Sequence, residues 1–184
     1  YTNLVTGIAL LLGFRLPDNF AAPYAAHNLK EFWGRWHISL SRFIRDYVYI
    51  PLGGNRQGAW RGNLNMLLAM LVSGLWHGAS ANFLIWGALH GIGLAIYKLF
   101  AQSAPGFAKV AGAGLLARLL TFHYVAFAWI FFRSPTLDGA LEMLADIAHV
   151  SLAGLNSSSG VLILACVLYL AIYPQLLKLL ERSL

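Results

Sequence analysis

Two histidines, each directly preceded by a tryptophan, are the residues of this sequence best suited to acid–base chemistry. His37 follows Trp36, and His77 follows Trp76. An aromatic neighbour shields an imidazole from water, and burial disfavours the charged form of the ring. A neutral imidazole that titrates near working pH is a suitable general base. The pattern therefore indicates a proton-transfer site, with His77 as the leading candidate and His37 as the second.

His77 stands out because it lies inside membrane-like sequence. It ends an apolar run over 64–77, and a second apolar run over 83–100 follows almost at once. An ionisable group at that depth costs about 2.5–3.5 kcal/mol on insertion scales and is a functional candidate by default. Gly74 and Gly78 flank it, so a helix or a thin acyl chain can approach closely. Spacing alone leaves a structural role open, because a buried histidine can also satisfy a neighbouring backbone carbonyl.

The other titratable side chains give weaker signals. With one cysteine, Cys166, the chain cannot form an internal disulfide, and we expect a small buried hydrophobic residue there. His77 and His90 are thirteen residues apart, which is out of register on one helix, so we expect no metal site. Structural or surface roles are expected for His27, His90, His123 and His149.

Composition places the chain in a membrane. Hydrophobic residues make up 59% and charged residues 11%, against about 45–50% and about 25% in soluble domains. Aromatic residues, at 14%, suit lipid–water boundaries. The formal net charge is +6, but the basic residues form no run and lie between apolar segments. We therefore interpret the charge as a topology signal and expect no nucleic-acid partner.

The pattern of apolar segments predicts an all-α fold, a polytopic transmembrane helical bundle with interfacial or re-entrant helices. The polar, aromatic-rich stretch 29–50 is too polar to span and is assigned to an interfacial or re-entrant element. Ser134 and Pro135 predict the start of an amphipathic surface helix over 135–150. We expect the end of a spanning helix at 1–14 and membrane helices at 63–79, 82–100, 116–132 and 160–178. Because Tyr1 lies within an apolar segment, we interpret residues 1–184 as the C-terminal part of one membrane domain.

Charge asymmetry predicts the orientation. Twelve of the 13 Lys and Arg residues fall into three groups: between Arg15 and Arg61, in the linker 98–118, and from Lys178 onward. If 64–100 crosses the membrane and returns, all three groups lie on one side, and only Arg133 lies on the other. The positive-inside rule then places the Arg15 to Arg61 block and the C-terminus in the cytoplasm.

Three stretches, 33–40, 45–56 and 74–79, closely resemble the membrane-bound O-acyltransferase family. The match is similar to the bacterial branch that O-acetylates exopolysaccharides such as alginate, and Phe131-Phe132-Arg133 also resembles that branch. The resemblance implies a bacterial inner-membrane protein with a cavity or tunnel through the bilayer. It also implies that His77 is the catalytic histidine and His37 the family's second histidine.

The resemblance implies transfer of an acetyl or other acyl group from a cytoplasmic thioester to a hydroxyl group. Acetyl-CoA or another acyl thioester is the expected donor, with no bound cofactor. His77 would remove the hydroxyl proton or briefly carry the acyl group. His37, Asn65 or Asn82 could polarise the carbonyl or orient His77. Trp76, directly beside His77, is expected to support it. The donor could be steered by three arginines, Arg42, Arg45 and Arg56.

The acceptor and the partners stay open at this point. The expected partners are the lipid bilayer, a polysaccharide acceptor and a periplasmic acetyltransferase or other polysaccharide-modifying protein. One alternative is D-alanyl or other acyl transfer to a cell-wall polymer. Another is an acyl relay or transport subunit without chemistry of its own, although a transporter would more often show inverted repeats, and none is visible.

Overall fold

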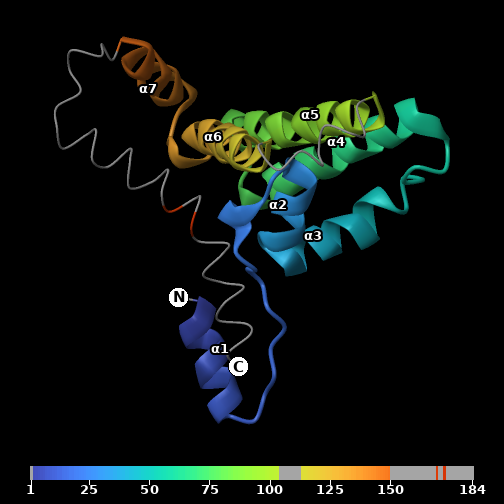
Figure 1. Cartoon of the computed structure of the whole chain (residues 1–184), viewed down its shortest axis with the longest axis vertical. Coiled ribbons are helices and arrows are strands. Elements are labelled where there is room, and N and C mark those ends of the chain that lie inside the picture. Colours follow the sequence, from blue (N-terminus) through green and yellow to red (C-terminus); the bar gives the residue numbers. More distant parts are fainter. Residues whose placement is uncertain (1, 104–112, 150–168, 170–171, 173–184) are drawn as a thin grey trace.

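The computed structural model describes residues 2–103, 113–149, 169 and 172, and these residues form helices and connecting loops without a strand (Figure 1). The all-α prediction is confirmed for this part of the chain. The helix expected at 160–178 lies outside the described residues, apart from 169 and 172. The elements are α1 (Thr2–Leu11), η1 (Pro23–Ala25), α2 (Leu29–Arg35), α3 (Ile38–Ile44), the π-helical turn η2 (Arg45–Tyr49), α4 (Gly58–His77), α5 (Ala81–Ser103), α6 (Ala113–Arg133) and α7 (Leu137–His149).

Helices α4 and α5 form the central hairpin, turning at residues 78–80. Glycines allow their backbones to touch. A Cβ at Gly74 would collide with the backbone oxygen of Phe83, and one at Gly87 would collide with that of Met70. The helix expected over 63–79 runs from Gly58 to His77, so it starts five residues earlier than predicted. Among the described helices, α5 and α6 are long and apolar enough to cross a membrane.

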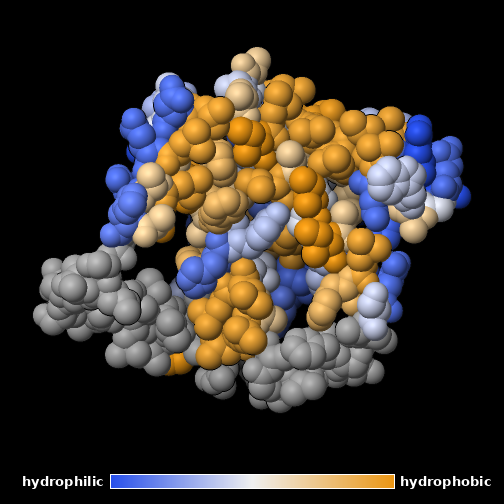
Figure 2. Space-filling view, turned by 90° about the horizontal axis from the view of Figure 1, so that it is seen from above, coloured by the Kyte–Doolittle hydropathy of each residue, from blue (hydrophilic) through white to orange (hydrophobic). Residues whose placement is uncertain are grey.

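Helix α6 packs on α5, and polar contacts lock the pair at two levels. The Tyr124 hydroxyl donates to the carbonyl of Leu89 (2.6 Å), and Asn82 Nδ2 donates to the carbonyl of Ser134 (2.8 Å). Apolar side chains of α6 fill the space between, among them Val125 and Ala128, both almost fully buried. Seen from the side of α4, α5 and α6, the surface is largely hydrophobic, with hydrophilic residues at its edges (Figure 2).

Helix α7 follows directly, but it does not start as the sequence suggested. The N-cap is Thr136, whose Oγ1 accepts a hydrogen bond from the Gly139 backbone N–H (3.1 Å). Ser134 is unavailable as a cap because its hydroxyl donates to the carbonyl of Ile130 in the last turn of α6 (2.8 Å). The expected Ser134 N-cap was therefore wrong. Helix α7 buries Ala140 against α6 and leaves Leu141 half-exposed.

Helices α2 and α3 form a short hairpin beneath the α4–α6 layer (Figure 1). Asn28 caps α2 by accepting from the backbone N–H of Glu31 (2.8 Å). At its start, His27 Nε2 accepts from Arg118 of α6 (2.9 Å). At the turn between α2 and α3, the His37 ring reaches Trp76 near the end of α4. Helix α2 thus runs along the α5–α6 pair from Arg118 toward Trp76, and the chain turns back at His37.

The return path of this hairpin ends at the opposite end of the layer. Leu40 and Ile44 pack with Ala69 of α4 in a small apolar cluster. The loop after η2 is then tied to both central helices. Asn65 Nδ2 donates to the carbonyl of Gly54 (3.0 Å), and Lys98 Nζ donates to Asn55 Oδ1 (2.8 Å). The re-entrant or interfacial assignment of 29–50 stays a prediction, because it concerns the position of this hairpin in the membrane.

Candidate active site

His77 lies at the C-terminal end of α4 inside a box of aromatic rings. Its ring centroid is 4.8 Å from those of Trp76 and Phe132, 5.4 Å from Trp86 and 6.0 Å from Phe83. These rings come from α4, α5 and α6, so the imidazole sits where the three helices meet. The side chain is half-buried. An imidazole so surrounded is partly shielded from water but stays partly accessible.

His37 occupies the turn between α2 and α3 in an unusual backbone conformation. Its φ of 43° and ψ of 54° are left-handed, a region that histidine enters more readily than most residues. Asn19 holds this turn from the preceding loop. The backbone oxygen of Asn19 accepts from the Ile38 N–H (2.9 Å), and its Oδ1 accepts from the backbone N–H and the hydroxyl of Ser39 (2.9 and 3.0 Å). Its Nδ2 lies 3.5 Å from His37 Nδ1. Asn19 was not among the residues predicted for the site, although asparagine commonly bonds nearby backbone in this way.

The structure brings both predicted histidines to one place. The His37 ring lies 6.1 Å from the Trp76 ring, edge to face, and the His77 ring lies 4.8 Å from it. Asn82 also belongs to this end of the layer, in the first turn of α5 next to Phe83. Asn82 is buried, and its Oδ1 has no hydrogen-bond partner among the described residues.

Asn65, the other predicted amide, lies elsewhere. It is on the same helix as His77 but twelve residues earlier, about 18 Å along the axis at 1.5 Å per residue. Its contact with Gly54 ties the loop after η2 to α4. The structure therefore does not bring Asn65 to His77, and among the candidate residues His37, Trp76 and Asn82 share its end of the molecule.

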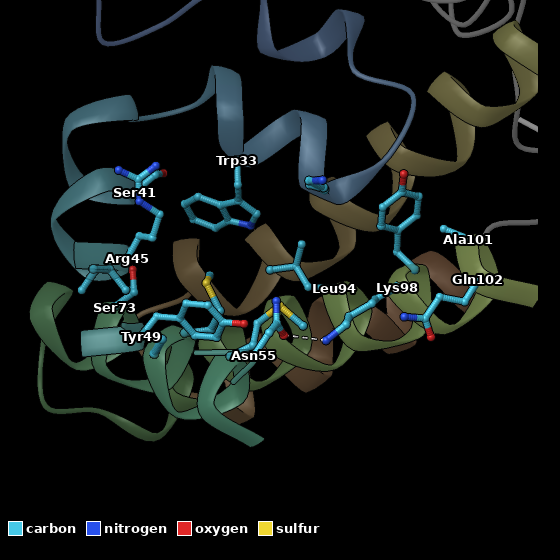
Figure 3. Close-up of a pocket in the computed structure, with 16 residues that line it drawn as sticks. Trp33, Ser41, Arg45, Tyr49, Asn55, Ser73, Leu94, Lys98, Ala101 and Gln102 are labelled. Carbon is cyan, nitrogen blue, oxygen red and sulfur yellow. Dashed lines mark hydrogen bonds between the residues drawn. The ribbon is translucent and has the colours of Figure 1, made fainter. Parts of the chain in front are cut away.

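A pocket of about 480 Å³ lies between the α2–α3 hairpin and the α4–α5 hairpin (Figure 3). Its exposed rim includes Lys30 and Arg45, and Lys98 is half-buried in its wall. Trp33 points into it from α2. Helix α4 contributes one stripe of its surface, with Met66, Ala69, Met70 and, at the inner end, the buried Ser73. Ser73 is one helical turn before His77, so the pocket reaches to within a turn of the histidine.

The predicted arginines divide around this pocket. Arg45 lines it, whereas Arg42 and Arg56 are exposed and do not. The Arg45 guanidinium donates to both oxygens of Asp46 (2.7 and 3.2 Å), and these bonds hold the pKa of Asp46 below its usual value. Lys98 was missed as a pocket residue, because nothing local to it in the sequence indicates that separate helices bring it to the pocket that Lys30 and Arg45 also line.

His90, expected to be structural, is fully buried beside this pocket. Its Nδ1 accepts a hydrogen bond from the indole N–H of Trp33 (3.3 Å), and its ring lies 4.9 Å from that of Trp86. The turn at 78–80 places His77 and His90 on separate helices, both in contact with Trp86. The assumption that His77 and His90 lie on one continuous helix was therefore wrong. Within the described ranges, no three His, Cys, Asp or Glu side chains gather into a metal-binding group.

A charged cluster anchors the start of α2, away from His77. Glu31 accepts from the backbone N–H and the ring of His27 (2.8 and 3.1 Å) and from Arg35 (2.7 Å). Partial burial raises the pKa of Glu31, but these hydrogen bonds and the nearby Arg35 charge outweigh it and leave the pKa lowered. The cluster fixes the helix that carries Trp33 and leads into His37.

Comparison with known proteins agrees with the three motifs. Residues 4–109 match the family model of the membrane-bound O-acyltransferases. The chain is 42% identical over 159 residues to the peptidoglycan O-acetyltransferase of Helicobacter pylori, covering 86% of this chain and 29% of that protein. It is 40% identical over 177 residues to the probable alginate O-acetylase AlgI of Pseudomonas aeruginosa, covering 90% of this chain and 33% of that protein. A teichoic acid D-alanyltransferase of Bacillus subtilis is 30% identical over 144 residues, 72% of this chain and 36% of that protein.

The chain thus spans about a third of the length of these relatives, and the part it spans includes both histidine motifs. The family model covers more than half of the chain, from α1 through α5. The resemblance inferred from residues 33–40, 45–56 and 74–79 is confirmed: the chain belongs to the membrane-bound O-acyltransferase family.

Proposed function

We propose that this protein transfers an acetyl or related acyl group from a cytoplasmic thioester to a hydroxyl group on the other side of the membrane. The observation that carries this proposal is the pocket beside α4. Its rim holds the cations Lys30 and Arg45, its interior is apolar, and its inner end at Ser73 lies one turn from His77. A phosphate-bearing acyl thioester such as acetyl-CoA needs this combination of a cationic entrance and an apolar interior near a base.

The distribution of charge over the two ends of the helical layer supports the proposed orientation. Lys98 contacts Asn55 beside Arg56, and Arg118 contacts His27, so these basic residues gather at one end. Arg133 lies at the other end, in the last turn of α6. The positive-inside rule favours a cytoplasmic location for the end that carries Arg56, Lys98 and Arg118, and hence for the pocket entrance. Arg42 and Arg56, which are exposed and do not line the pocket, are proposed to steer the donor toward it.

The proposed chemistry uses His77 as general base. It takes the proton from the acceptor hydroxyl as that oxygen attacks the thioester carbonyl. It then returns the proton to the departing thiolate, so the ring is restored at the end of each cycle. A positioned base of this kind contributes on the order of 10²–10⁴-fold to the rate. His37 and Asn82 are proposed to orient the reacting groups, with Trp76 as the wall that His37 and His77 share.

The proposed acceptor is an extracytoplasmic polysaccharide, or a partner protein outside the membrane that passes the group to one. The named activities of the relatives, on peptidoglycan, alginate and teichoic acid, support a cell-envelope glycan as the class of acceptor. D-alanyl transfer is the second candidate, supported by the teichoic acid relative at lower identity. A relay subunit without its own chemistry is the competing proposal of another class.

The deciding experiment supplies labelled acetyl-CoA to one side of proteoliposomes that contain the whole protein, with polymer and partner on the other side. Labelled polymer or labelled partner supports the transferase, whereas label that crosses without covalent attachment supports transport. His77→Ala should insert normally and form no labelled product. Persistent product in that variant would overturn the assignment of His77 as the base.

A further inference from the structure

Two buried tryptophans contact His90, and within the described part of the chain only one of their indole N–H groups has a partner. Trp33 Nε1 donates to His90 Nδ1 (3.3 Å). Trp86 is only 3% exposed, and its Nε1 has no hydrogen-bond partner among the described residues. Buried indole N–H groups usually find an acceptor, and an orphaned buried donor costs about 1–3 kcal/mol. Phenylalanine would fill most of the same space without that cost, so the N–H of Trp86 calls for an acceptor from outside these residues.

The position of Trp86 indicates which acceptor that is. Its ring lies 5.4 Å from the His77 ring, nearly perpendicular at 87°, and 5.3 Å from the Phe132 ring that closes the same aromatic box. The unpaired donor is therefore on a side chain that directly contacts the proposed base. Trp33, whose N–H is satisfied, is not among the rings that contact His77.

The neighbouring positions on α5 carry matching unpaired groups. Asn82 Oδ1 and His90 Nε2, one turn before and one turn after Trp86, are also buried without partners in the described part of the chain. Because His90 Nδ1 accepts from Trp33, the neutral ring carries its proton on Nε2, and this atom is a donor. This face of α5 therefore offers two N–H donors and one amide oxygen. Neutral N–H donors can stabilise a carbonyl oxygen that gains negative charge, and they would not bind a cation.

We propose that the indole N–H of Trp86 hydrogen-bonds to the carbonyl oxygen of the acyl group while His77 acts on the acceptor hydroxyl, an inference that rests on the proposed function. As the hydroxyl oxygen bonds to the carbonyl carbon, the C=O π electrons move onto the carbonyl oxygen, and Trp86 stabilises that charge without giving up its proton. When the C=O bond reforms, the C–S bond breaks, and the thiolate takes the proton held by His77. Trp86 is thus a catalytic residue that acts on the oxyanion.

The test removes the indole N–H of Trp86 while keeping an aromatic ring of similar size at that position. The whole protein in proteoliposomes is assayed with acetyl-CoA after Trp86→Phe, and after replacement of Trp86 by benzothienylalanine, which has sulfur in place of the indole N–H. Both changes should lower kcat by about 10²-fold, the effect of losing one oxyanion donor, with little change in the donor KM. Trp129→Phe is the matched control, because Trp129 packs against Tyr24 and Trp36 and does not contact His77. It should keep the kcat of the unmodified protein.

The outcomes separate this inference from the function beneath it. If His77→Ala is inactive and the benzothienylalanine protein keeps full kcat, the role of Trp86 is overturned and the transferase assignment stands. If His77→Ala keeps its activity, the proposed function itself fails. A rise in donor KM at constant kcat would also overturn the inference, because it reports ground-state binding. If Trp86→Phe fails to insert, the isosteric replacement decides.

Discussion

His37 and His77 pack against the same indole ring, that of Trp76, although forty residues separate them in the chain. The α2–α3 turn carries His37 to the end of α4, and Asn19 holds the left-handed backbone that this turn requires. The helices therefore place two imidazoles at the level where α4 turns into α5. Two titratable groups at one point, on separate elements, can divide the tasks of base and orienting group.

Substitutions at His37 should separate its side chain from its backbone. His37→Gly relieves the left-handed strain, about 1 kcal/mol for a non-glycine residue, and should keep or raise the thermal midpoint while lowering kcat. His37→Asn, which tolerates this backbone and retains a polar side chain, should keep more activity than His37→Ala. Kinetics and thermal unfolding of the three variants test this. Equal activity in all three would exclude a role for the imidazole in the reaction.

The cations of the pocket should control donor affinity rather than the chemical step. Lys98→Met keeps the aliphatic stem but removes a charge from the wall, and Lys98→Glu reverses it. We expect the KM for acetyl-CoA to rise in that order with kcat nearly constant. The effect should weaken at high salt, because salt screens the attraction between the pocket cations and the approaching phosphates. Arg133→Gln, at the opposite end of α6, is the control. An equal change in KM from Arg133→Gln would show that net charge, and not the pocket, is responsible.

Replacement of glycine by alanine should have opposite effects on stability at Gly74, in the α4–α5 contact, and at Gly34, in α2. Gly74→Ala places a Cβ against the backbone of Phe83 and should cost about 1–3 kcal/mol or more, because neither helix can move aside without opening the packed hairpin. Gly34→Ala, in α2, meets nothing within 4 Å and should stabilise by about 0.5–1 kcal/mol. Thermal unfolding in detergent measures both. A Gly74→Ala protein as stable as the unmodified one would contradict the close approach.

The cluster around Glu31 should make stability depend on pH in the acid range. The pKa of Glu31 is lowered from 4.5 in the folded protein, so its contribution is fully present above that value. It should be lost as the pH falls through the lower folded pKa, because the carboxyl group is then protonated and its bonds from His27 and Arg35 weaken. Thermal midpoints measured from pH 6 to pH 3 should fall less steeply in Glu31→Gln. Parallel curves for the two proteins would refute the assignment.

The sequence by itself determined the membrane class, the all-helical fold and the family, and it singled out His37 and His77 as candidates, because each of these depends on composition or on residues close together in the chain. The apolar runs, the Trp–His pairs and the motif order are local features. Boundaries were predicted less well. Helix α4 starts at Gly58 rather than at 63. The N-cap of α7 is Thr136 rather than Ser134, because the Ser134 hydroxyl bonds to α6 instead.

Only the tertiary structure decided which side chains meet. Asn82 lies at the His77 end and Asn65 does not, because the α4–α5 turn brings residue 82 back beside residue 77 while residue 65 stays three helical turns away. Lys98 joins Arg45 at the pocket, and the ring of Trp86, whose N–H has no partner among the described residues, contacts the ring of His77 from a separate helix. Helical periodicity is set within one segment, but the approach of two helices depends on the glycines and rings at their interface, and that is a property of the packed molecule.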